Sequence, residues 1–284
     1  MNKKTGLVLE GGAMRGIFTA GVTDIMMENG IDFDGVIGVS AGAAFGCNYK
    51  SKQNGRAIRY NLKFCNDKRF CSVQSLIKTG DMFGAEFCYH ELPSKHDIFD
   101  TKTFEENPQE FYVVCTDVIT GKPVYKRLDK AEYNDLEWIR ASASMPLASR
   151  IVEIDGYKLL DGGISDSIPL AYFQKIGYEK CVVILTQPKG YIKTPSKSIY
   201  AAKLILRKYP ELIKTLENRP EVYNKQVKYI RNEEKKGNVF VIAPEEKLPV
   251  NRVEHDADKL RAVYEIGRKI GKKRLNDLKA FLEK

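Results

Sequence analysis

The sequence predicts an α/β fold: a three-layer sandwich with helices on both faces of a central, mostly parallel sheet, followed by a mainly helical C-terminal extension. Over residues 1–190, short apolar runs typical of strands alternate with segments that carry apolar residues at helical spacing. The longest apolar run, Cys181 to Leu185, resembles a strand covered on both faces. Residues 191–284 form long, charged, helix-like segments. We therefore divide the chain into an α/β domain, 1–190, and a basic, mainly helical extension, 191–284.

The α/β domain begins with a short buried strand, residues 5–10, and a helix over 14–29 that Gly30 ends. A strand over 36–39 and a helix rich in small residues over 41–49 follow. Asp155-Gly156 is the dipeptide most typical of a tight hairpin, and it separates strands expected over 151–154 and 157–160. Further strands are expected over 111–116, 124–128 and 180–186, the first two around a turn at residues 120–123.

In the extension, helices are expected over 198–208, 210–218, 221–236 and 256–284. One strand over 238–243 interrupts them, and the sequence leaves its direction and its sheet open. The last helix carries an apolar stripe formed by Leu260, Val263, Tyr264, Gly267 and Ile270. Because an apolar stripe on a helix is buried against other apolar surface, the simplest architecture is a helical layer that packs on the α/β core.

Composition excludes several classes of protein. With 284 residues, 43% hydrophobic and 29% charged, the chain can bury a sizeable core. No apolar run approaches the roughly 18 to 20 residues that cross a bilayer. The basic start is followed by Glu10 and Gly11 before a signal-peptide core forms, so we expect a cytoplasmic protein. Six cysteines without a C-x-x-C pair indicate free thiols, and no metal or cofactor is expected.

The basic excess lies in the extension. The formal net charge is +9, and residues 191–284 hold 23 basic and 13 acidic residues, which leaves 23 basic and 24 acidic residues for 1–190. Such a segment suits a peripheral contact with the anionic inner face of a membrane. Exposed basic helices are more often simply solvated, and we favour the covering role for the extension. We expect no nucleic acid partner.

The first chemical motif is Gly38-Val39-Ser40-Ala41-Gly42, a G-x-S-x-G between a strand and a helix. Side chains flanking the serine on so sharp a turn would collide with neighbouring backbone, which explains Gly38 and Gly42. The turn exposes the Ser40 hydroxyl near the positive end of the following helix. This context favours a nucleophile over a purely structural turn.

The second motif is Gly11-Gly12-Ala13-Met14-Arg15-Gly16, again between a strand and a helix. Glycines allow several main-chain N–H groups to converge on an oxyanion. A phosphate-binding loop is the alternative, because the same geometry binds phosphates. Ala13 stands where a dinucleotide-binding G-x-G-x-x-G needs glycine, and no Gly-Lys-Ser/Thr of a Walker A loop follows. For Arg15, a charge-stabilising role and a salt bridge that pins the loop are equally open.

A general base must activate Ser40, because a serine hydroxyl is a weak nucleophile. The chain has three histidines, His90, His96 and His255, all in polar or charged segments. His255 fits the chain order of a Ser-Asp-His triad, but no apolar strand end holds it. Asp161 is the better candidate, since it ends an expected strand and two glycines follow it.

Together the three segments resemble the patatin-like phospholipase family. The resemblance covers roughly residues 5–190 and includes Ala141 to Pro146, similar to the serine-rich segment before the family's aspartate. It implies a Ser-Asp dyad acyl hydrolase with Ser40 as nucleophile and Asp161 as base. The oxyanion hole would be formed by Gly11, Gly12 and Ala13, where many members have glycine in place of Ala13. Supporting positions are Arg15, Gly16, Gly38, Gly42 and Gly162.

The same resemblance implies fatty acyl esters of phospholipids, lysophospholipids or glycerides as substrates. Residues 56–70 interleave basic and aromatic side chains, a mixture that suits a membrane interface, although aromatic residues at helical spacing are more often core. Two other classes remain open. An acyltransferase would use the same dyad, and a non-catalytic lipid- or nucleotide-binding protein would use the glycine loop alone.

Overall fold

The computed structural model describes residues 4–283 and contains an eight-stranded sheet. Its strands follow the order β5-β6-β3-β2-β1-β7-β8, and β4 pairs with β3. Strands β3, β2, β1, β7 and β8 are parallel to one another, whereas β4 and β6 pair antiparallel with β3, and β5 pairs antiparallel with β6. The strands are β1 (Thr5–Leu9), β2 (Gly35–Val39), β3 (Glu110–Asp117), β4 (Pro123–Arg127), β5 (Val152–Ile154), β6 (Tyr157–Asp161), β7 (Lys180–Ile184) and β8 (Val239–Ile242).

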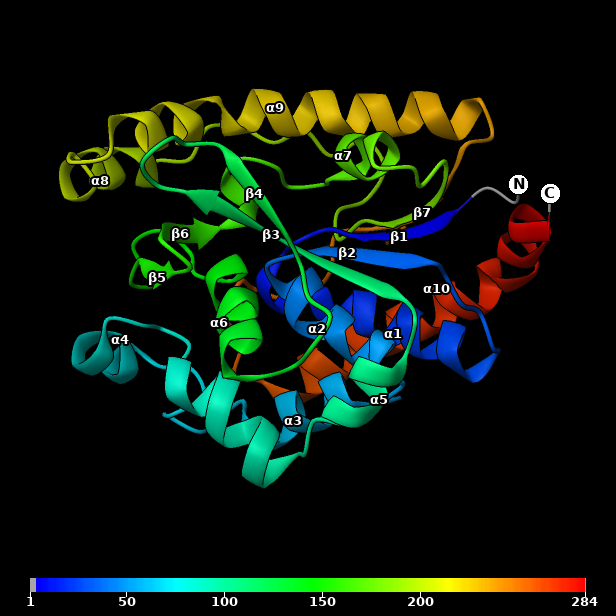
Figure 1. Ribbon diagram of the computed structural model, residues 1–284, viewed down its shortest axis with the longest axis horizontal. Helices are drawn as coiled ribbons and strands as arrows, with labels where there is room; N and C mark the ends of the chain where they lie inside the picture. Colours follow the sequence, from blue (N-terminus) through cyan, green and yellow to red (C-terminus); the bar gives the residue numbers. More distant parts are fainter. Residues whose placement is uncertain (1–3, 284) are drawn as a thin grey trace.

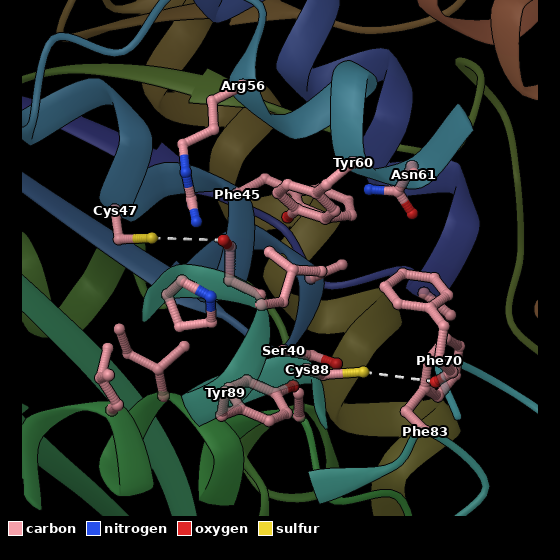
Figure 2. Close-up of a pocket in the computed structure, with 18 of the residues that line it drawn as sticks. Ser40, Phe45, Cys47, Arg56, Tyr60, Asn61, Phe70, Phe83, Cys88 and Tyr89 are labelled. Atoms are coloured by element: carbon pink, nitrogen blue, oxygen red, sulfur yellow. Dashed lines mark hydrogen bonds between the residues drawn. The ribbon is translucent and has the colours of Figure 1, made fainter. Parts of the chain in front are cut away.

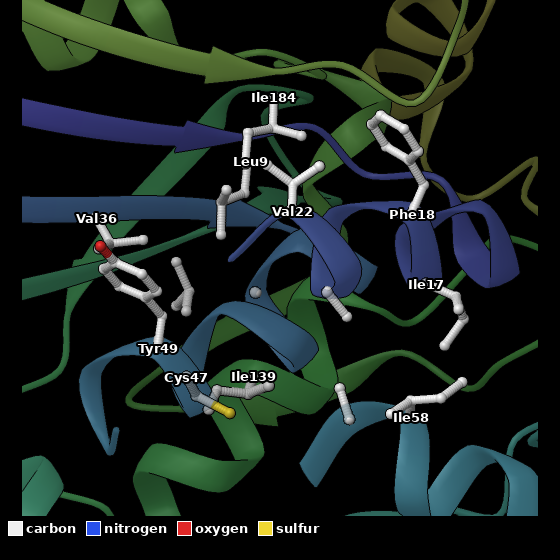
Figure 3. Close-up of a cluster of buried hydrophobic side chains, with 14 of the residues drawn as sticks. Leu9, Ile17, Phe18, Val22, Val36, Cys47, Tyr49, Ile58, Ile139 and Ile184 are labelled. Atoms are coloured by element: carbon white, nitrogen blue, oxygen red, sulfur yellow. The ribbon is translucent and has the colours of Figure 1, made fainter. Parts of the chain in front are cut away.

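Helices cover both faces of this sheet, which confirms the three-layer α/β sandwich (Figure 1). On one face lie α1 (Gly16–Glu28), α2 (Ala41–Lys50) and α10 (Ala257–Glu283), and on the other lie α7 (Leu170–Lys175) and α9 (Pro210–Lys235). Alternate strand residues serve the two faces, as the period of a strand requires. Leu9, Val36 and Ile184 face α1 and α2, where Figure 3 shows them with Val22 and Tyr49.

The C-terminal extension joins the core at two places. Its strand β8 is parallel to β7 and forms one edge of the sheet. The structure thereby gives the direction and the sheet of this strand, which the sequence leaves open. Its last helix, α10, packs along α1, and the whole predicted stripe from Leu260 to Ile270 is buried there. The helices approach closely because a Cβ on Gly21 would lie 2.3 Å from the Tyr264 carbonyl oxygen, and one on Gly267 would lie 2.2 Å from that of Phe18. Lys284 lies outside the described residues.

The local predictions for the α/β domain are largely confirmed. Helix α1 ends at Glu28, and Gly30 follows it with φ +64°. Asp155 and Gly156 have φ values of +49° and +80°, the backbone of the hairpin turn that their sequence predicts. A short 3₁₀ turn, η1 (Ala13–Arg15), precedes α1.

Two predictions for helical segments were wrong. The expected helices 210–218 and 221–236 are one helix, α9, with Pro220 inside it. Proline removes one hydrogen bond, but Leu212, Tyr223 and Ile230 hold both halves of α9 against the protein. The polar stretch around His90 and His96, expected to be a loop, is a π-helix, η2 (Phe87–His96).

The structure also contains helices to which no range was assigned from the sequence. They are α3 (Arg56–Phe64), α4 (Val73–Thr79), α5 (Thr101–Glu106), α6 (Tyr133–Ser142) and η3 (Gly162–Ile164). The helix expected over 198–208 is present as the shorter α8 (Ser198–Ile205). Among the helices of residues 4–283, none combines the length and the apolar character needed to cross a membrane.

We expect Gly267→Ala to lower the free energy of unfolding by about 1–3 kcal/mol, because the added methyl group meets helix backbone that cannot move without separating α10 from α1. Urea denaturation measures the change. Lys269→Ala is the matched control, since Lys269 is exposed on the same helix. Equal unfolding midpoints for the two variants would show that the close approach at Gly267 does not stabilise the protein.

Candidate active site

Strand β3 brings the ends of β2 and β6 together. Residues 112–114 of β3 pair with both β2 and β4, and residues 115–116 pair with both β4 and β6. Because a strand has two edges, β2 and β6 must lie end to end along the same edge of β3, opposite β4. They run toward each other: Val39 of β2 is opposite Val114, and Asp161 of β6 is opposite Cys115. The residue after Val39 is Ser40.

Ser40 occupies a strained turn between β2 and α2. Its φ is +55° and its ψ is −121°, a backbone conformation that residues other than glycine rarely adopt. The flanking glycines are required by contact: a Cβ on Gly38 would lie 2.5 Å from the Gly42 carbonyl oxygen, and one on Gly42 would lie 2.4 Å from that of Leu9. The side chain stands at the N-terminus of α2, whose dipole stabilises negative charge.

Ser40 and Asp161 form a direct hydrogen bond. The Ser40 Oγ donates to Asp161 Oδ2 at 2.6 Å, and the other carboxylate oxygen accepts the Gly163 N–H at 2.7 Å. Burial raises the pKa of Asp161 above its usual value, while the Ser40 hydrogen bond and then the charge of Arg219 act in the opposite direction. A carboxylate with a raised pKa is a stronger base than a solvated one. A Cβ on Gly162 would lie 2.0 Å from the Val114 carbonyl oxygen, so no side chain fits there.

The segment that resembles the family's serine-rich stretch holds both residues of the pair. The Ser142 hydroxyl accepts the Ser40 N–H at 2.9 Å and donates to the Val114 carbonyl at 2.6 Å. It therefore bridges the gap in the ladder where the chain leaves β2 and turns into α2. The Ser144 carbonyl accepts the Asp161 N–H at 2.8 Å. Ser142 was not singled out from the sequence, because its bridging role depends on the register of β3.

The glycine loop lies beside Ser40. A Cβ on Gly11 would be 2.9 Å from the Val39 carbonyl oxygen and 3.1 Å from the Ser40 Cβ, and one on Gly16 would be 2.8 Å from that of Ala41. Within residues 4–283, the N–H groups of Gly12 and Ala13 donate to no other group, so they are available to an oxyanion. Ala13 has φ +49°, in the region that favours glycine, which is the residue that many members of the resembled family have there.

A buried carboxylate that sequence reasoning missed supports this loop from behind. Glu10 accepts the Thr186 N–H at 2.5 Å and the Tyr223 hydroxyl at 2.8 Å. The Thr186 hydroxyl also donates to the Glu10 carboxylate, at 3.1 Å. These partners come from β7's end and from α9, so the network ties the loop after β1 to the C-terminal extension. No sequence signal distinguishes Glu10 from an ordinary residue at a strand end.

An apolar pocket opens from Ser40 (Figure 2). Figure 2 shows the serine together with aromatic side chains contributed by α2, α3, η2 and the segments between them. The lining includes Phe45, Tyr60, Phe70, Phe83 and Tyr89. Of the basic and aromatic stretch 56–70, the aromatic residues Tyr60, Phe64 and Phe70 are buried, so they form pocket and core and not a membrane interface.

The one cation in the pocket wall, Arg56, is held by other groups of the protein. Its guanidinium donates to the Asn48 side chain at 2.8 Å and to the Asp97 carbonyl at 2.6 Å. The pocket therefore offers apolar surface and aromatic rings to a ligand, as an acyl chain requires.

The three histidines form hydrogen bonds with groups other than Ser40 and Asp161. His90 and His96 bond to Glu137 and Glu91, at 2.8 Å and 2.9 Å, and His255 Nδ1 bonds to the Cys65 carbonyl at 2.6 Å. Asp161 is thus the group that accepts the Ser40 hydrogen bond. Over residues 4–283, no group of three or more His, Cys, Asp or Glu side chains has a metal-binding arrangement.

Comparison with known families matches two parts of the chain. Residues 7–173 match the patatin-like phospholipase family, and residues 209–283 match a domain of unknown function, DUF6363. Since the first match covers more than half of the chain, the chain belongs to the patatin-like phospholipase family. Membership in a family of phospholipases supports a lipid hydrolase.

Individual relatives are moderately similar. YjjU, an uncharacterized protein of Escherichia coli K12, is 29% identical over 275 residues, which cover 94% of this chain and 75% of YjjU. Mb1092c, an uncharacterized NTE family protein of Mycobacterium bovis, is 29% identical over 59% of this chain and 45% of its own length. Lysophospholipase nte1 of Aspergillus fumigatus is 28% identical over 71% of this chain and 13% of its own length. The chain thus spans less than half of the last two proteins.

We expect Ser142→Ala to lower the free energy of unfolding by about 1–3 kcal/mol, because it leaves the buried Ser40 N–H and Val114 carbonyl without their shared partner. Ser144→Ala is the control, since its hydroxyl bonds only to the Arg140 carbonyl and its own carbonyl still accepts from Asp161. Urea denaturation compares them. A Ser142→Ala variant as stable as Ser144→Ala would contradict the bridging role.

Proposed function

We propose that this protein is a serine acyl hydrolase of the lipase, phospholipase A or lysophospholipase type, which cleaves fatty acyl esters through a Ser40-Asp161 dyad and a covalent acyl-enzyme. The observation that carries the proposal is the 2.6 Å hydrogen bond from Ser40 Oγ to a buried carboxylate, at the N-terminus of a helix and at the opening of an apolar pocket. Membership in the patatin-like phospholipase family supports the same chemistry.

The proposed reaction begins when Asp161 accepts the Ser40 proton and Ser40 Oγ attacks the ester carbonyl carbon. The N–H groups of Gly12 and Ala13 stabilise the oxyanion, with Gly11 shaping the loop beside Ser40. The ester C–O bond then breaks, and the protonated Asp161 gives its proton to the leaving alcohol. Asp161 next accepts a proton from water, whose oxygen attacks the carbonyl carbon of the acyl-enzyme. The bond between that carbon and Ser40 Oγ then breaks, Asp161 returns the proton to Ser40 Oγ, and the fatty acid leaves. No step of this scheme needs a metal ion or a cofactor.

Different observations bear on the two parts of the substrate, the acyl chain and the alcohol. The apolar pocket suits a fatty acyl chain, because its lining is mainly aromatic and aliphatic. The printed name of the Aspergillus relative, lysophospholipase, favours a lysophospholipid or phospholipid as the whole substrate. An acyltransferase would form the same acyl-enzyme and transfer it to an alcohol in place of water.

We expect Ser40→Ala and Asp161→Asn each to lower the turnover of short-chain p-nitrophenyl esters on the order of 10³-fold or more, because they remove the nucleophile and its base. Replacing all three histidines by Gln is the control and should leave substantial activity, since none of them contacts the dyad. Circular dichroism checks that each variant is folded. Near-wild-type turnover by folded Ser40→Ala would rule out the dyad.

Labelling and product analysis separate the other classes. A fluorophosphonate should label wild type and not Ser40→Ala, whereas a non-catalytic lipid-binding protein would be labelled in neither form. If adding an acceptor alcohol diverts most of the acyl group from fatty acid to a new ester, the protein is an acyltransferase and the hydrolase assignment is wrong.

We also propose that the extension makes a peripheral contact with anionic membranes through α8. This short helix exposes Tyr200, Leu204 and Ile205, each more than 60% accessible. Exposed basic residues surround it, among them Lys197, Arg207 and Lys208. Apolar side chains flanked by cations are suited to the boundary of an anionic lipid surface. A cytoplasmic protein would meet such a surface at the inner face of the membrane.

Co-sedimentation tests the membrane contact. Wild type should pellet with anionic vesicles at low salt and progressively less as salt rises, because each Lys or Arg near the surface contributes about 1 kcal/mol within a screening length. Neutral vesicles should bind poorly. Leu204→Gln with Ile205→Gln should reduce pelleting, while Ile98→Gln, at another exposed apolar residue, should not. Absence of pelleting at the lowest salt would remove the proposal.

A further inference from the structure

Four basic side chains gather around the Ser40-Asp161 pair. Arg15 comes from η1, and Lys193, Arg219 and Arg252 come from the extension. Their charges act on one another: burial, and then the charges of Arg219, Arg15 and Arg252, lower the pKa of Lys193 to about 8, with Glu10 acting in the opposite direction. Arg219 experiences the same neighbours, and its pKa is also lowered, first by burial. Four cations are thus held within electrostatic reach of each other.

Hydrogen-bonding groups of these cations are left without acceptors in the described part of the chain. Within residues 4–283, no side-chain hydrogen bond or ion pair with a carboxylate forms at Arg15, Lys193, Arg219 or Arg252. The Nε atoms of Arg15 and Arg219 are buried and have no acceptor. The Lys193 ammonium lies over the Tyr223 ring, 4.3 Å from its centre. A guanidinium that is buried without an acceptor is costly, which points to an anion that completes the cluster.

The cluster lies beside the reacting groups and outside the lining of the acyl pocket. Arg15 Nη2 is 3.3 Å from the position that a Cβ on Gly12 would take, and Arg219 Nη2 is 3.3 Å from that of Gly163, whose N–H binds Asp161. Ser40 lines the apolar pocket, but none of the four cations does. Arg252 is exposed, so the cluster is open to solvent. A ligand that passes Ser40 therefore meets apolar surface at one end and positive charge at the other.

The two carboxylates nearby do not neutralise this charge. Glu10 already accepts hydrogen bonds from Thr186 and Tyr223, and Asp161 accepts them from Ser40 and Gly163. Four cations against two carboxylates leave a net positive site. Guanidinium groups present several N–H donors in a planar fork that matches the oxygen atoms of a phosphate.

From this arrangement we infer that Lys193, Arg219 and Arg252, together with Arg15, bind the phosphate group of the lipid substrate next to the scissile ester. The inference rests on the proposed function and narrows its substrate class to acyl esters that carry a phosphate on the alcohol side. It also gives the extension a direct role in the site, since three of the four cations belong to residues 191–284.

A matched substrate pair tests the inference by kinetics. One substrate is a 1-acyl-glycerol 3-phosphate and the other is the 1-acyl-glycerol with the same chain. Wild type should have a kcat/KM at least about tenfold higher for the phosphate ester, and Arg219→Gln and Arg252→Gln should each reduce that ratio about tenfold, as expected for a lost charge-assisted contact. Loss of Arg219 also affects Asp161, but this acts on both substrates, so the ratio isolates the phosphate contact.

Arg261→Gln is the matched control. Arg261 is an exposed cation of the same extension, on α10, and its replacement should leave the ratio unchanged. A ratio that stays at the wild-type value in Arg219→Gln and in Arg252→Gln would overturn the inference.

A binding experiment separates failure of the inference from failure of the proposed hydrolase. Calorimetric titration of Ser40→Ala with glycerol 3-phosphate needs no turnover, and it should show binding that Arg219→Gln and Lys193→Gln weaken about tenfold, while Arg261→Gln does not. Inorganic phosphate is the second probe. If phosphate binds and glycerol 3-phosphate binds no tighter, with an unchanged kinetic ratio, the site belongs to free phosphate and the headgroup assignment is wrong. Absence of binding by either probe would also overturn it.

Discussion

The candidate active site depends on one property of a strand, namely that it has only two edges. With β4 on one edge of β3, the strands β2 and β6 must share the other, and they meet at their C-terminal ends. Ser40 and Asp161, which are 121 residues apart in the sequence, are thereby brought into hydrogen-bonding contact by the ends of two strands. Ser142 closes the remaining gap in hydrogen bonding. The position of the pair is thus a consequence of backbone register, which is among the most rigid features of a fold.

Two electrostatic effects at this junction act on Asp161 in opposite directions. Burial favours the neutral form of Asp161, whereas the positive charge of Arg219 favours its ionised form. Because burial is the larger effect, the pKa of Asp161 is raised, and a carboxylate with a raised pKa is a stronger base than one in water. Arg219 and the other cations of its cluster lie beside the proposed oxyanion loop. Negative charge that develops near Ser40 is therefore stabilised by nearby positive charge.

Much of the fold and the Ser40-Asp161 pair could be predicted from the sequence, because the features that specify them are local. Gly38 is imposed by its contact with Gly42, within the turn that carries Ser40, and Asp155-Gly156 has its turn conformation by itself. Glu10 and Ser142, by contrast, acquire partners only when distant strands are in register. Arg219 is one basic residue among many in a charged helix, and only the way α9 lies across the sheet brings it to Asp161. The continuity of α9 through Pro220 was missed for a related reason, since tertiary packing overrides the local preference of proline.

The contact between α1 and α10 has a consequence for how the protein folds. The two glycines that let these helices approach, Gly21 and Gly267, lie far apart in the sequence, and a contact of such separation forms late and slowly. Until α10 docks, the apolar side of α1 is without its final cover. A folding intermediate that lacks this contact therefore exposes apolar helix surface, through which partly folded chains aggregate.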